Sequence, residues 1–166
     1  MASTFSFDIV SDYNLAEVIN AVDQTKRELG TRYDLKGTSA SVEFSSADKT
    51  GLTIIGVNQF AVDAILDIVR KKCALRGVSQ KVLDTSKQPV MSNLKATLDV
   101  PFIKGLDQDK AKKITALLRE HFPKAKTQIQ GPEVRVTSSK KDELQAIMRL
   151  LESQDFDFAL SFTNFR

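Results

Sequence analysis

The sequence predicts an α+β protein in which one order of strands and helices occurs twice along 166 residues. Three observations support this fold class. Short runs alternate apolar and polar residues with the period of two that marks a half-exposed strand. Longer stretches repeat apolar residues every three or four positions, as an amphipathic helix does. The order strand-helix-strand-strand-helix-strand is found on each side of one polar segment, residues 84–92.

The first half opens with a strand at residues 5–10, in which Phe5, Phe7 and Ile9 share one face. Asp12 or Asn14 can cap the helix that follows, because either side chain can accept a hydrogen bond from a free amide of the first turn. The remaining elements predicted for this half are a helix to about residue 33, strands at 41–44 and 52–55, a helix from Asn58 to about Gly77, and a short strand near 81–83.

The second half repeats this plan, and its clearest element is a hairpin at residues 126–136. Two alternating runs flank Gly131 and Pro132, a pair typical of a turn. A strand at residues 95–100 and a helix capped by Asp107 come before the hairpin. Ser139 and Asp142 resemble a capping box in front of the next helix. The last predicted strand covers residues 156–165, with inward side chains at Phe158, Leu160 and Phe162.

Each half has the size of a minimal domain, and the order β-α-β-β-α-β is that of the ferredoxin-like fold. We therefore predict a tandem of two ferredoxin-like domains, residues 1–84 and 93–166. A linker at residues 85–92 joins them, since this segment is polar, contains a proline and has no periodicity. Each domain has an antiparallel four-stranded sheet with two helices on one face. The other face stays open, so a binding site is expected there.

Composition narrows the class of protein. The net charge is +3 and the isoelectric point is about 9.0, which is less basic than a duplex-DNA binder usually is. A single cysteine, Cys73, argues against a disulfide framework or a cysteine zinc site. The start of the chain lacks the features of a signal peptide, and no stretch has the length of a membrane span. These observations predict a cytoplasmic protein with no membrane partner.

Catalysis has little support in the sequence. The single histidine, His121, stands beside Phe122 and Pro123 at the end of a helix, where a structural role is expected. Cys73 suits a half-buried position for a small hydrophobic side chain. No nucleophile–base set, paired carboxylates or metal-ligand spacing is recognisable. We therefore predict a binding protein without catalytic residues, metal or cofactor.

The exposed face of the predicted hairpin carries amides and a cation. Gln128, Gln130 and Arg135 fall on this face. Amides can read the edges of bases, and a guanidinium can bind a phosphate. A solvated strand without any ligand would have the same composition, so both interpretations stay open. Neither third strand, residues 52–55 or 133–137, has an aromatic residue, so bases are not expected to stack on the sheets.

The start of the third helix is a second candidate. Lys104 and Gly105 come just before Asp107, and free amides at a helix N-terminus can bind a phosphate. Ordinary capping is the alternative, because Asp107 would occupy those amides and repel an anion. The spacing is not that of a Walker A loop, so ATP hydrolysis has no support.

Several local phrases are distinctive: SFDIVSD, NAVDQ, TRYDLKG, QIQGPEVRVTSSKKDELQ and FTNFR. Together, from residue 5 to residue 166, they resemble the YajQ family of small bacterial nucleotide-binding proteins. The resemblance implies a tandem of ferredoxin-like domains, similar to RNA-recognition folds, that exchange their first strands. It also implies nucleotide binding with links to RNA and, for some members, binding of cyclic di-GMP followed by an influence on transcription.

One residue pair can test the implied strand exchange. With exchange, residues 6–10 join the second sheet and residues 95–100 the first, so that Asp8 would lie near Arg135 on the open face. Without exchange, Asp8 would face Thr53 or Ile55. The exchange gives Asp8 the better partner.

The resemblance draws attention to TRYDLKG and to the end of the chain. Arg32 and Lys36 would bind phosphates, and Arg32 or Tyr33 would stack on a guanine; a helix C-cap is the alternative. Arg166 joins the set because the last strand would hold it in a sheet. The predicted ligand-binding residues are therefore Arg32, Tyr33, Lys36, Lys104, Gln128, Gln130, Arg135 and Arg166.

The primary functional prediction is an effector that binds a purine nucleotide (cyclic di-GMP, GTP or ATP) and signals to a protein partner, such as a transcription regulator. The alternative is an RNA- or ribosome-associated protein that acts through phosphate contacts, which carry little sequence information. A structural adaptor without a nucleotide is the third hypothesis.

Overall fold

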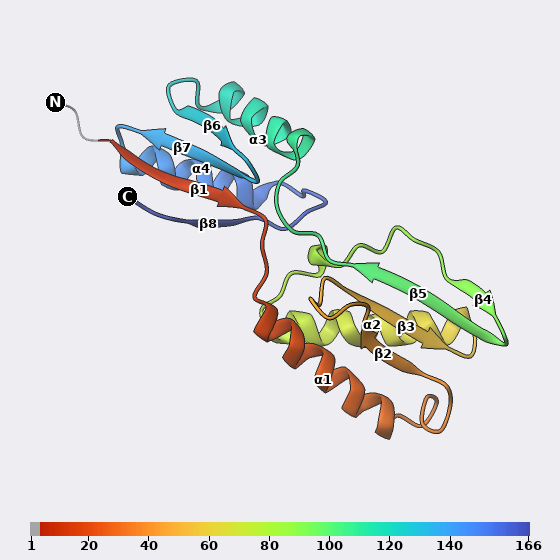
Figure 1. Cartoon of the computed structure of the whole chain (residues 1–166). Helices are drawn as coiled ribbons and strands as arrows, with labels where there is room; N and C mark the ends of the chain where they lie inside the picture. The colour runs from red at the N-terminus through yellow and green to blue at the C-terminus, as the bar shows by residue number, and fades with distance from the viewer. Residues whose placement is uncertain (1–3) are drawn as a thin grey trace. The chain divides into compact units, whose positions relative to one another are not determined.

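The computed structural model describes residues 4–166, so residues 1–3 of the predicted first domain lie outside the described part. The chain forms two compact units. Unit 1 contains residues 4–12 together with Lys104–Arg166, and unit 2 is Tyr13–Ile103. Each unit has its own sheet and its own pair of helices (Figure 1).

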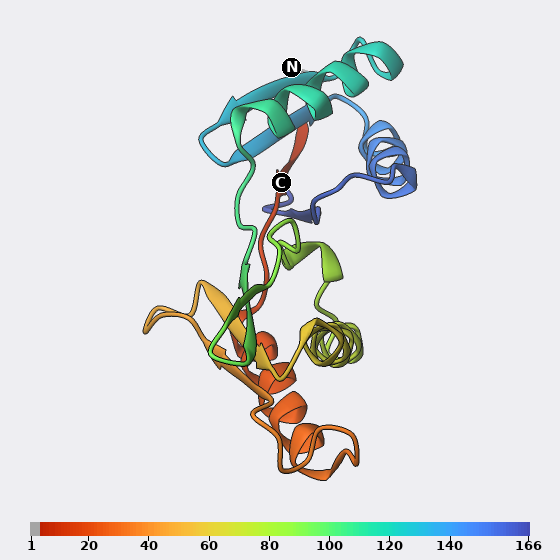
Figure 2. The same cartoon turned by 90° about the vertical axis from the view of Figure 1, so that its right-hand side faces the viewer.

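Unit 1 has an antiparallel sheet in the order β6-β7-β1-β8, and its helices α3 and α4 lie on one face (Figure 2). Its elements are β1 (Phe5–Val10), α3 (Gln108–His121), β6 (Lys126–Gln130), β7 (Glu133–Ser138), α4 (Lys141–Ser153) and β8 (Ser161–Thr163).

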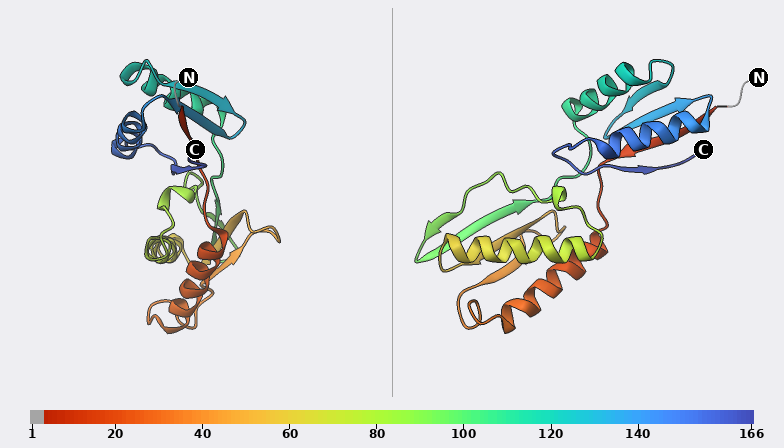
Figure 3. Two further views of the ribbon diagram at one scale, coloured as in Figure 1. Left: turned by 90° about the vertical axis from the view of Figure 1, so that its left-hand side faces the viewer. Right: turned by 180° about the vertical axis from the view of Figure 1, so that it is seen from behind.

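Unit 2 has an antiparallel sheet in the order β2-β3-β5-β4, with α1 and α2 on one face (Figure 3). Its elements are α1 (Leu15–Thr31), β2 (Ser41–Phe44), β3 (Gly51–Gly56), α2 (Gln59–Leu75), the 3-10 helix η1 (Gln80–Val82), β4 (Val90–Ser92) and β5 (Lys95–Pro101).

The pairing of β1 and β5 confirms the predicted fold with exchanged first strands. β1 pairs with β7 and β8, so the first strand of the chain lies in the second sheet. β5 pairs with β3 and β4, so the first strand of the second half lies in the first sheet. In this register Asp8 is directly opposite Arg135, as the exchange requires.

The core of unit 1 lies between its sheet and its helices. Phe7 and Ile9 on β1 are fully buried, as their period-two spacing predicts. Ile114 and Leu118 on α3 and Ile147 on α4 are also fully buried and pack in the same cluster. Burial of each such side chain contributes about 2 kcal/mol, so these residues fix which sheet face is covered. The opposite face is left for polar side chains.

Some predicted elements differ from the structure. The residues expected to form a strand near 81–83 form η1 instead, and only Leu83 makes an isolated bridge, to Phe102. The fourth strand of this sheet is β4, at the end of the segment predicted to be a linker. The capping box of Ser139 and Asp142 is also wrong. The Ser138 hydroxyl, one residue earlier, bonds Glu143 at 2.9 Å, and the N-cap residue of α4 makes no side-chain capping bond.

Three of the predicted helix N-caps are confirmed by side-chain hydrogen bonds. Asn14, rather than Asp12, caps α1, and Asn58 caps α2. Asp107 caps α3. Within the described residues, none of the helices combines the length and the apolar character needed to cross a membrane.

Candidate functional site

Two rows of polar side chains cross the open face of the unit 1 sheet. Directly paired residues of antiparallel strands point to the same face, so each row extends from β6 to the far edge. The first row consists of Gln128, Arg135, Asp8 and Thr163. The second row consists of Lys126, Thr137, Ser6 and Arg166.

Asp8 and Arg135 form the centre of the first row. Arg135 donates from Nε to Asp8 Oδ1 at 2.9 Å and from Nη2 to Oδ2 at 3.3 Å. Asn164 donates from Nδ2 to the same Oδ2 at 2.9 Å. Asp8 is only 3% exposed although it lies on the open face, because the neighbouring side chains cover it. The predicted ion pair is therefore present, and it is more enclosed than an ordinary surface pair.

These hydrogen bonds favour the charged carboxylate. The bonds from Arg135 lower the pKa of Asp8 from its usual 3.8, although burial acts in the opposite direction. The bond from Asn164 and the positive charges of Arg135 and Arg166 lower it further. Asp8 in turn raises the pKa of Arg135. The pair is thus ionised at neutral pH, and its two charges cancel.

A one-residue bulge at Asn164 decides where the last side chains point. Asp8 pairs with Thr163, but Ser6 exchanges two backbone hydrogen bonds with Arg166, so two residues oppose Phe7 instead of one. Asn164 has a φ of 57°, in the left-handed region that asparagine tolerates better than most residues. Bulges of this kind redirect side chains at functional sites.

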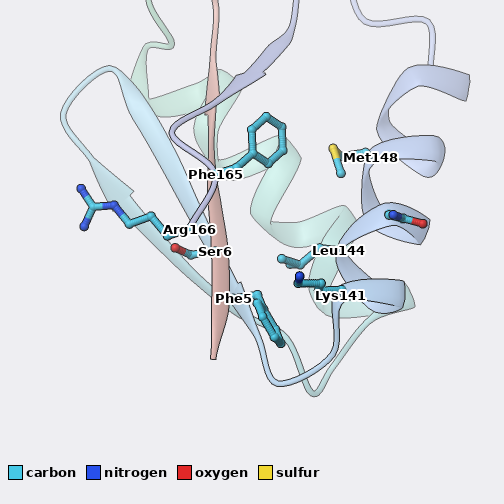
Figure 4. A pocket seen from close by; sticks show the side chains of 8 residues that line it. Phe5, Ser6, Lys141, Leu144, Met148, Phe165 and Arg166 are labelled. Carbon is cyan, nitrogen blue, oxygen red and sulfur yellow. The ribbon is translucent and has the colours of Figure 1, made fainter. Parts of the chain in front are cut away.

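The bulge exchanges the faces of the last two side chains. Arg166 points away from α4, on the same side of β1 as Ser6, whereas Phe165 points toward α4 (Figure 4). The ring of Phe165 stacks on Phe7 with centroids 6.0 Å apart. With an unbroken period of two, Phe165 would lie opposite Ser6 on the open face. The bulge therefore adds a second guanidinium to the polar face.

One edge of Arg135 stays available to a ligand. A guanidinium has five N–H groups, and Asp8 accepts from two of them. The other three donate to no group among residues 4–166, and the side chain is 30% exposed. Because Asp8 cancels its charge, Arg135 suits a neutral acceptor, such as the carbonyl or ring nitrogen of a base. An anion is attracted instead by Lys126 and Arg166, whose charges exceed that of Glu133 on the same face.

The two amides predicted for the site lie together on β6. Gln130 donates from Nε2 to Gln128 Oε1 at 3.3 Å, and Gln128 is directly opposite Arg135. The structure thus brings Gln128, Gln130, Arg135 and Arg166 onto one face of unit 1.

The other predicted residues lie elsewhere. Arg32, Tyr33 and Lys36 belong to unit 2, in the turn that follows α1. The backbone N–H of Arg32 caps α1 on Glu28 at 2.8 Å, and its Nε donates to Asp34 at 2.8 Å. The capping interpretation is therefore correct for the main chain. Tyr33 is 98% exposed, so its ring is open to solvent on both sides.

Lys104 is in unit 1 but in neither row. Its Nζ lies 3.8 Å from Asp12 Oδ1. At the start of α3, Asp107 Oδ1 accepts from the amide of Lys110 at 2.8 Å. The Asp107 carboxylate thus occupies the Lys110 amide that a phosphate would need. This arrangement is the ordinary helix cap that was the alternative to a phosphate site.

Unit 2 has a polar recess that was not predicted. Its volume is about 360 Å³, and it lies on the open face of the sheet around Thr53 and Asp99, which are hydrogen-bonded at 3.4 Å. Lys87 also lines it. Gly51 is part of the lining, and a Cβ at this position would lie 3.0 Å from the Val100 carbonyl oxygen. No local pattern indicates this recess, since Lys87 comes from the segment predicted to be a linker.

His121 and Cys73, the two residues considered for catalysis, make contacts typical of structural residues. His121 Nδ1 lies 3.1 Å from the carbonyl oxygen of Leu117. Cys73 is 1% exposed, which is deeper than the half-buried position predicted, and burial raises the pKa of its thiol to about 11. Among the described residues, no group of three acidic, histidine or cysteine side chains could hold a metal ion.

A family model described as "Nucleotide-binding protein YajQ-like" matches residues 5–166. The chain belongs to this YajQ-like family. A relative from Trichodesmium erythraeum is 43% identical over 166 residues, and one from Thermobifida fusca is 43% identical over 167 residues. A third, from Chloroherpeton thalassium, is 40% identical over 166 residues. In all three cases the match covers the whole of both chains, and each relative is named "Nucleotide-binding protein".

The YajQ-like match thus confirms the resemblance seen in the local phrases. The names of these relatives describe nucleotide binding and mention no reaction. The polar face of unit 1 is built by β1, β6, β7 and β8 with the residues that follow it, and these parts of the chain carry SFDIVSD, QIQGPEVRV and FTNFR.

Proposed function

We propose that this YajQ-like chain binds a purine nucleotide, such as cyclic di-GMP, GTP or ATP, on the open face of unit 1. The nucleotide-binding names of full-length relatives support the general class. The observation that carries the proposal is the central ion pair, in which Asp8 holds Arg135 in place while three of its N–H groups stay available. A held guanidinium loses little freedom when a ligand binds.

Base and phosphate would be recognised by different parts of this face. The outer edge of Arg135 and the amide of Gln128 offer donors and an acceptor to the edge of a purine. Asp8 has little capacity left, because its carboxylate already accepts three hydrogen bonds. Lys126 and Arg166, in the second row, would bind phosphate oxygens.

Arg32, Tyr33 and Lys36 form a second candidate contact in unit 2. A tyrosine ring that is 98% exposed beside two cations suits stacking on a base. The same observation favours the alternative function, an RNA-binding protein that acts through stacking and phosphate contacts. As an effector, the nucleotide-bound protein would act in the cytoplasm on a protein partner such as a transcription regulator.

Titration calorimetry separates these functions. The same sample is titrated with cyclic di-GMP, GTP, ATP and a short single-stranded RNA at about 50 and about 200 mM salt, because phosphate-driven binding falls steeply with salt. Tight binding of one small nucleotide that tolerates salt supports the effector. Binding of RNA alone, lost at the higher salt, supports the alternative. Binding of none of them refutes both and leaves the structural adaptor.

Paired variants locate the nucleotide. Arg166→Gln should weaken binding about tenfold by removing a charge-assisted hydrogen bond. Arg149→Gln is the matched control, since Arg149 is an exposed arginine on α4 in the same unit. In unit 2, Arg32→Gln is compared with Arg27→Gln, which removes an exposed arginine of α1. If Arg166→Gln and Arg149→Gln have equal affinity, the nucleotide does not bind to the polar face through Arg166.

A further inference from the structure

A recess of about 270 Å³ opens on the helix side of unit 1, between α4 and β1 with the end of the chain. Phe5, Leu144, Met148 and Phe165 surround it (Figure 4). The polar rows lie on the other side of the sheet, where Ser6 and Arg166 point in Figure 4. Ser6 and Arg166 also line the recess at its edge, so it adjoins the face proposed for the nucleotide while its apolar walls lie on the helix side.

The walls of the recess are apolar and partly solvent-exposed. Leu144 is 6% exposed, and Phe5 and Met148 pack at the edge of the unit 1 core. Phe165 forms an outer wall and is 61% exposed, a position that it takes because of the bulge at Asn164. A ligand that covers these side chains would remove apolar surface from water, which is favourable. The flexible side chain of Met148 can also adapt to the shape of a ligand.

The charged groups around the recess have one sign. No aspartate or glutamate lines it. The charged residues that do are Lys141 and Arg166, and Lys141 stands at the rim with Nζ 5.0 Å from the centre of the Phe5 ring. Within residues 4–166, Lys141 makes no ion pair. An apolar recess with a cation at its edge is complementary to a molecule that has an apolar body and one negative charge.

We propose that this recess binds a short-chain amphipathic carboxylate of the fatty-acid class. The apolar tail lies against Leu144, Met148 and Phe165, and the carboxylate lies at the rim beside Lys141. The volume is just below the usual range of small-molecule pockets, so it takes one compact chain and is too small for a helix of a partner protein. The proposal does not depend on nucleotide binding.

Methionine-methyl NMR of the full chain tests this proposal directly. Met148 lines the recess, whereas Met91 is an exposed residue of β4 in unit 2 and serves as the internal control. Octanoate should shift the Met148 signal saturably and leave Met91 unchanged. Octanol and octylammonium have the same chain without the negative charge, and they should bind more weakly. The proposal would be overturned if the Met148 signal did not shift at about 10 mM octanoate, a concentration well above the dissociation constant expected for so small a ligand.

Two further comparisons separate the roles of the tail and the charge. Octanoate should bind about 15-fold more tightly than hexanoate, because two more methylene groups are buried. Lys141→Gln should weaken octanoate binding about threefold, as expected for an exposed ion pair. Lys140→Gln, which changes the neighbouring exposed lysine, should have no effect. Equal binding of octanoate and octylammonium, or equal effects of the two lysine variants, would refute the role of Lys141.

A variant that fills the recess gives an independent check. Met148→Trp places a larger side chain in the cavity and should abolish octanoate binding in calorimetry, with the fold checked by circular dichroism. Should this variant fail to fold, the lysine pair and the chain-length series still decide the question. A folded Met148→Trp protein that binds octanoate as tightly as the wild type would show that the ligand binds elsewhere.

Discussion

Replacing Asp8 by asparagine tests the centre of the polar face. The substitution keeps the shape of the side chain but removes its charge and turns one acceptor into a donor. The asparagine oxygen can still accept from Arg135 Nε, the bond that is 2.9 Å long. The new amide group then faces the donors of Arg135 Nη2 and Asn164 Nδ2, which now hydrogen-bond to Oδ2 of the carboxylate. Two of three hydrogen bonds are therefore lost.

The expected cost is about 2 kcal/mol of unfolding free energy. Hydrogen bonds to a charged group contribute about 1.5–3 kcal/mol each when they are shielded. The Asp8 side chain is 4% exposed, but that of Arg135 is 30% exposed and regains water when the pair is broken. Solvent therefore returns part of the loss, which places the expected cost below the sum of about 3–6 kcal/mol for two such bonds.

The pH dependence gives a sharper test than the value at pH 7 alone. The pKa of Asp8 is lowered in the folded protein, so its carboxylate stabilises the fold above the unfolded pKa of about 3.9. That contribution is lost as the pH falls through the folded pKa, where the wild-type side chain also becomes neutral. The difference between wild type and Asp8→Asn should thus be full at pH 7 and shrink below about pH 4.

Urea unfolding, followed at the Met148 methyl signal, measures this difference in unit 1. Asp157→Asn is the control, since Asp157 is an exposed carboxylate of the same unit. It should change the unfolding free energy by less than about 0.5 kcal/mol, as most surface substitutions do. The reasoning fails if Asp8→Asn is as stable as the control at pH 7, or if its deficit is equally large at pH 3.

Three other predictions concern unit 2. Gly51→Ala should lower the unfolding free energy by about 1–3 kcal/mol, because its Cβ would lie 3.0 Å from the Val100 carbonyl oxygen; urea unfolding at the Met91 signal measures this. Asn58→Ala should cost about 1 kcal/mol by removing the cap of α2, seen as a lower thermal midpoint in circular dichroism. Cys73, buried and with a thiol pKa of about 11, should resist iodoacetamide at pH 8 in the folded protein and react once urea unfolds it.

Long and regular patterns made most of the fold predictable from the sequence. The helices carry apolar residues at helical spacing, and the hairpin of β6 and β7 alternates strictly around Gly131. The exchange of first strands could not be predicted from such patterns. Local patterns say nothing about which sheet a strand joins, so this prediction depended on the resemblance and on the match between Asp8 and Arg135.

β4 could not be predicted because three residues are too few to show a period. Val90, Met91 and Ser92 are all exposed, so no buried face marks them as a strand. Their place is set by pairing with β5, a contact that only the folded chain supplies. Short edge strands of this kind are common, and they leave little trace in the sequence.

The polar face was predictable in part. The period of two places Gln128 and Arg135 on one face, and Lys126, two residues before Gln128, falls on the same face. It could not show that Asn164 would cover Asp8. Asparagine is one of the few residues that enter the left-handed region readily, but most asparagines do not, so the bulge has no clear signal in the sequence.

The polar face requires the two ends of the chain to fold together. Asp8 is 127 residues from Arg135 and 156 residues from Asn164, yet its carboxylate joins β1 to β7 and to the residue that follows β8. Because β1 is central in the unit 1 sheet, a fragment that begins after residue 92 would lack both that strand and Asp8. Such a fragment would instead carry β5, the central strand of the other sheet. The two halves of the sequence are therefore not two separable proteins, and any ligand on this face reports on the integrity of the strand exchange itself.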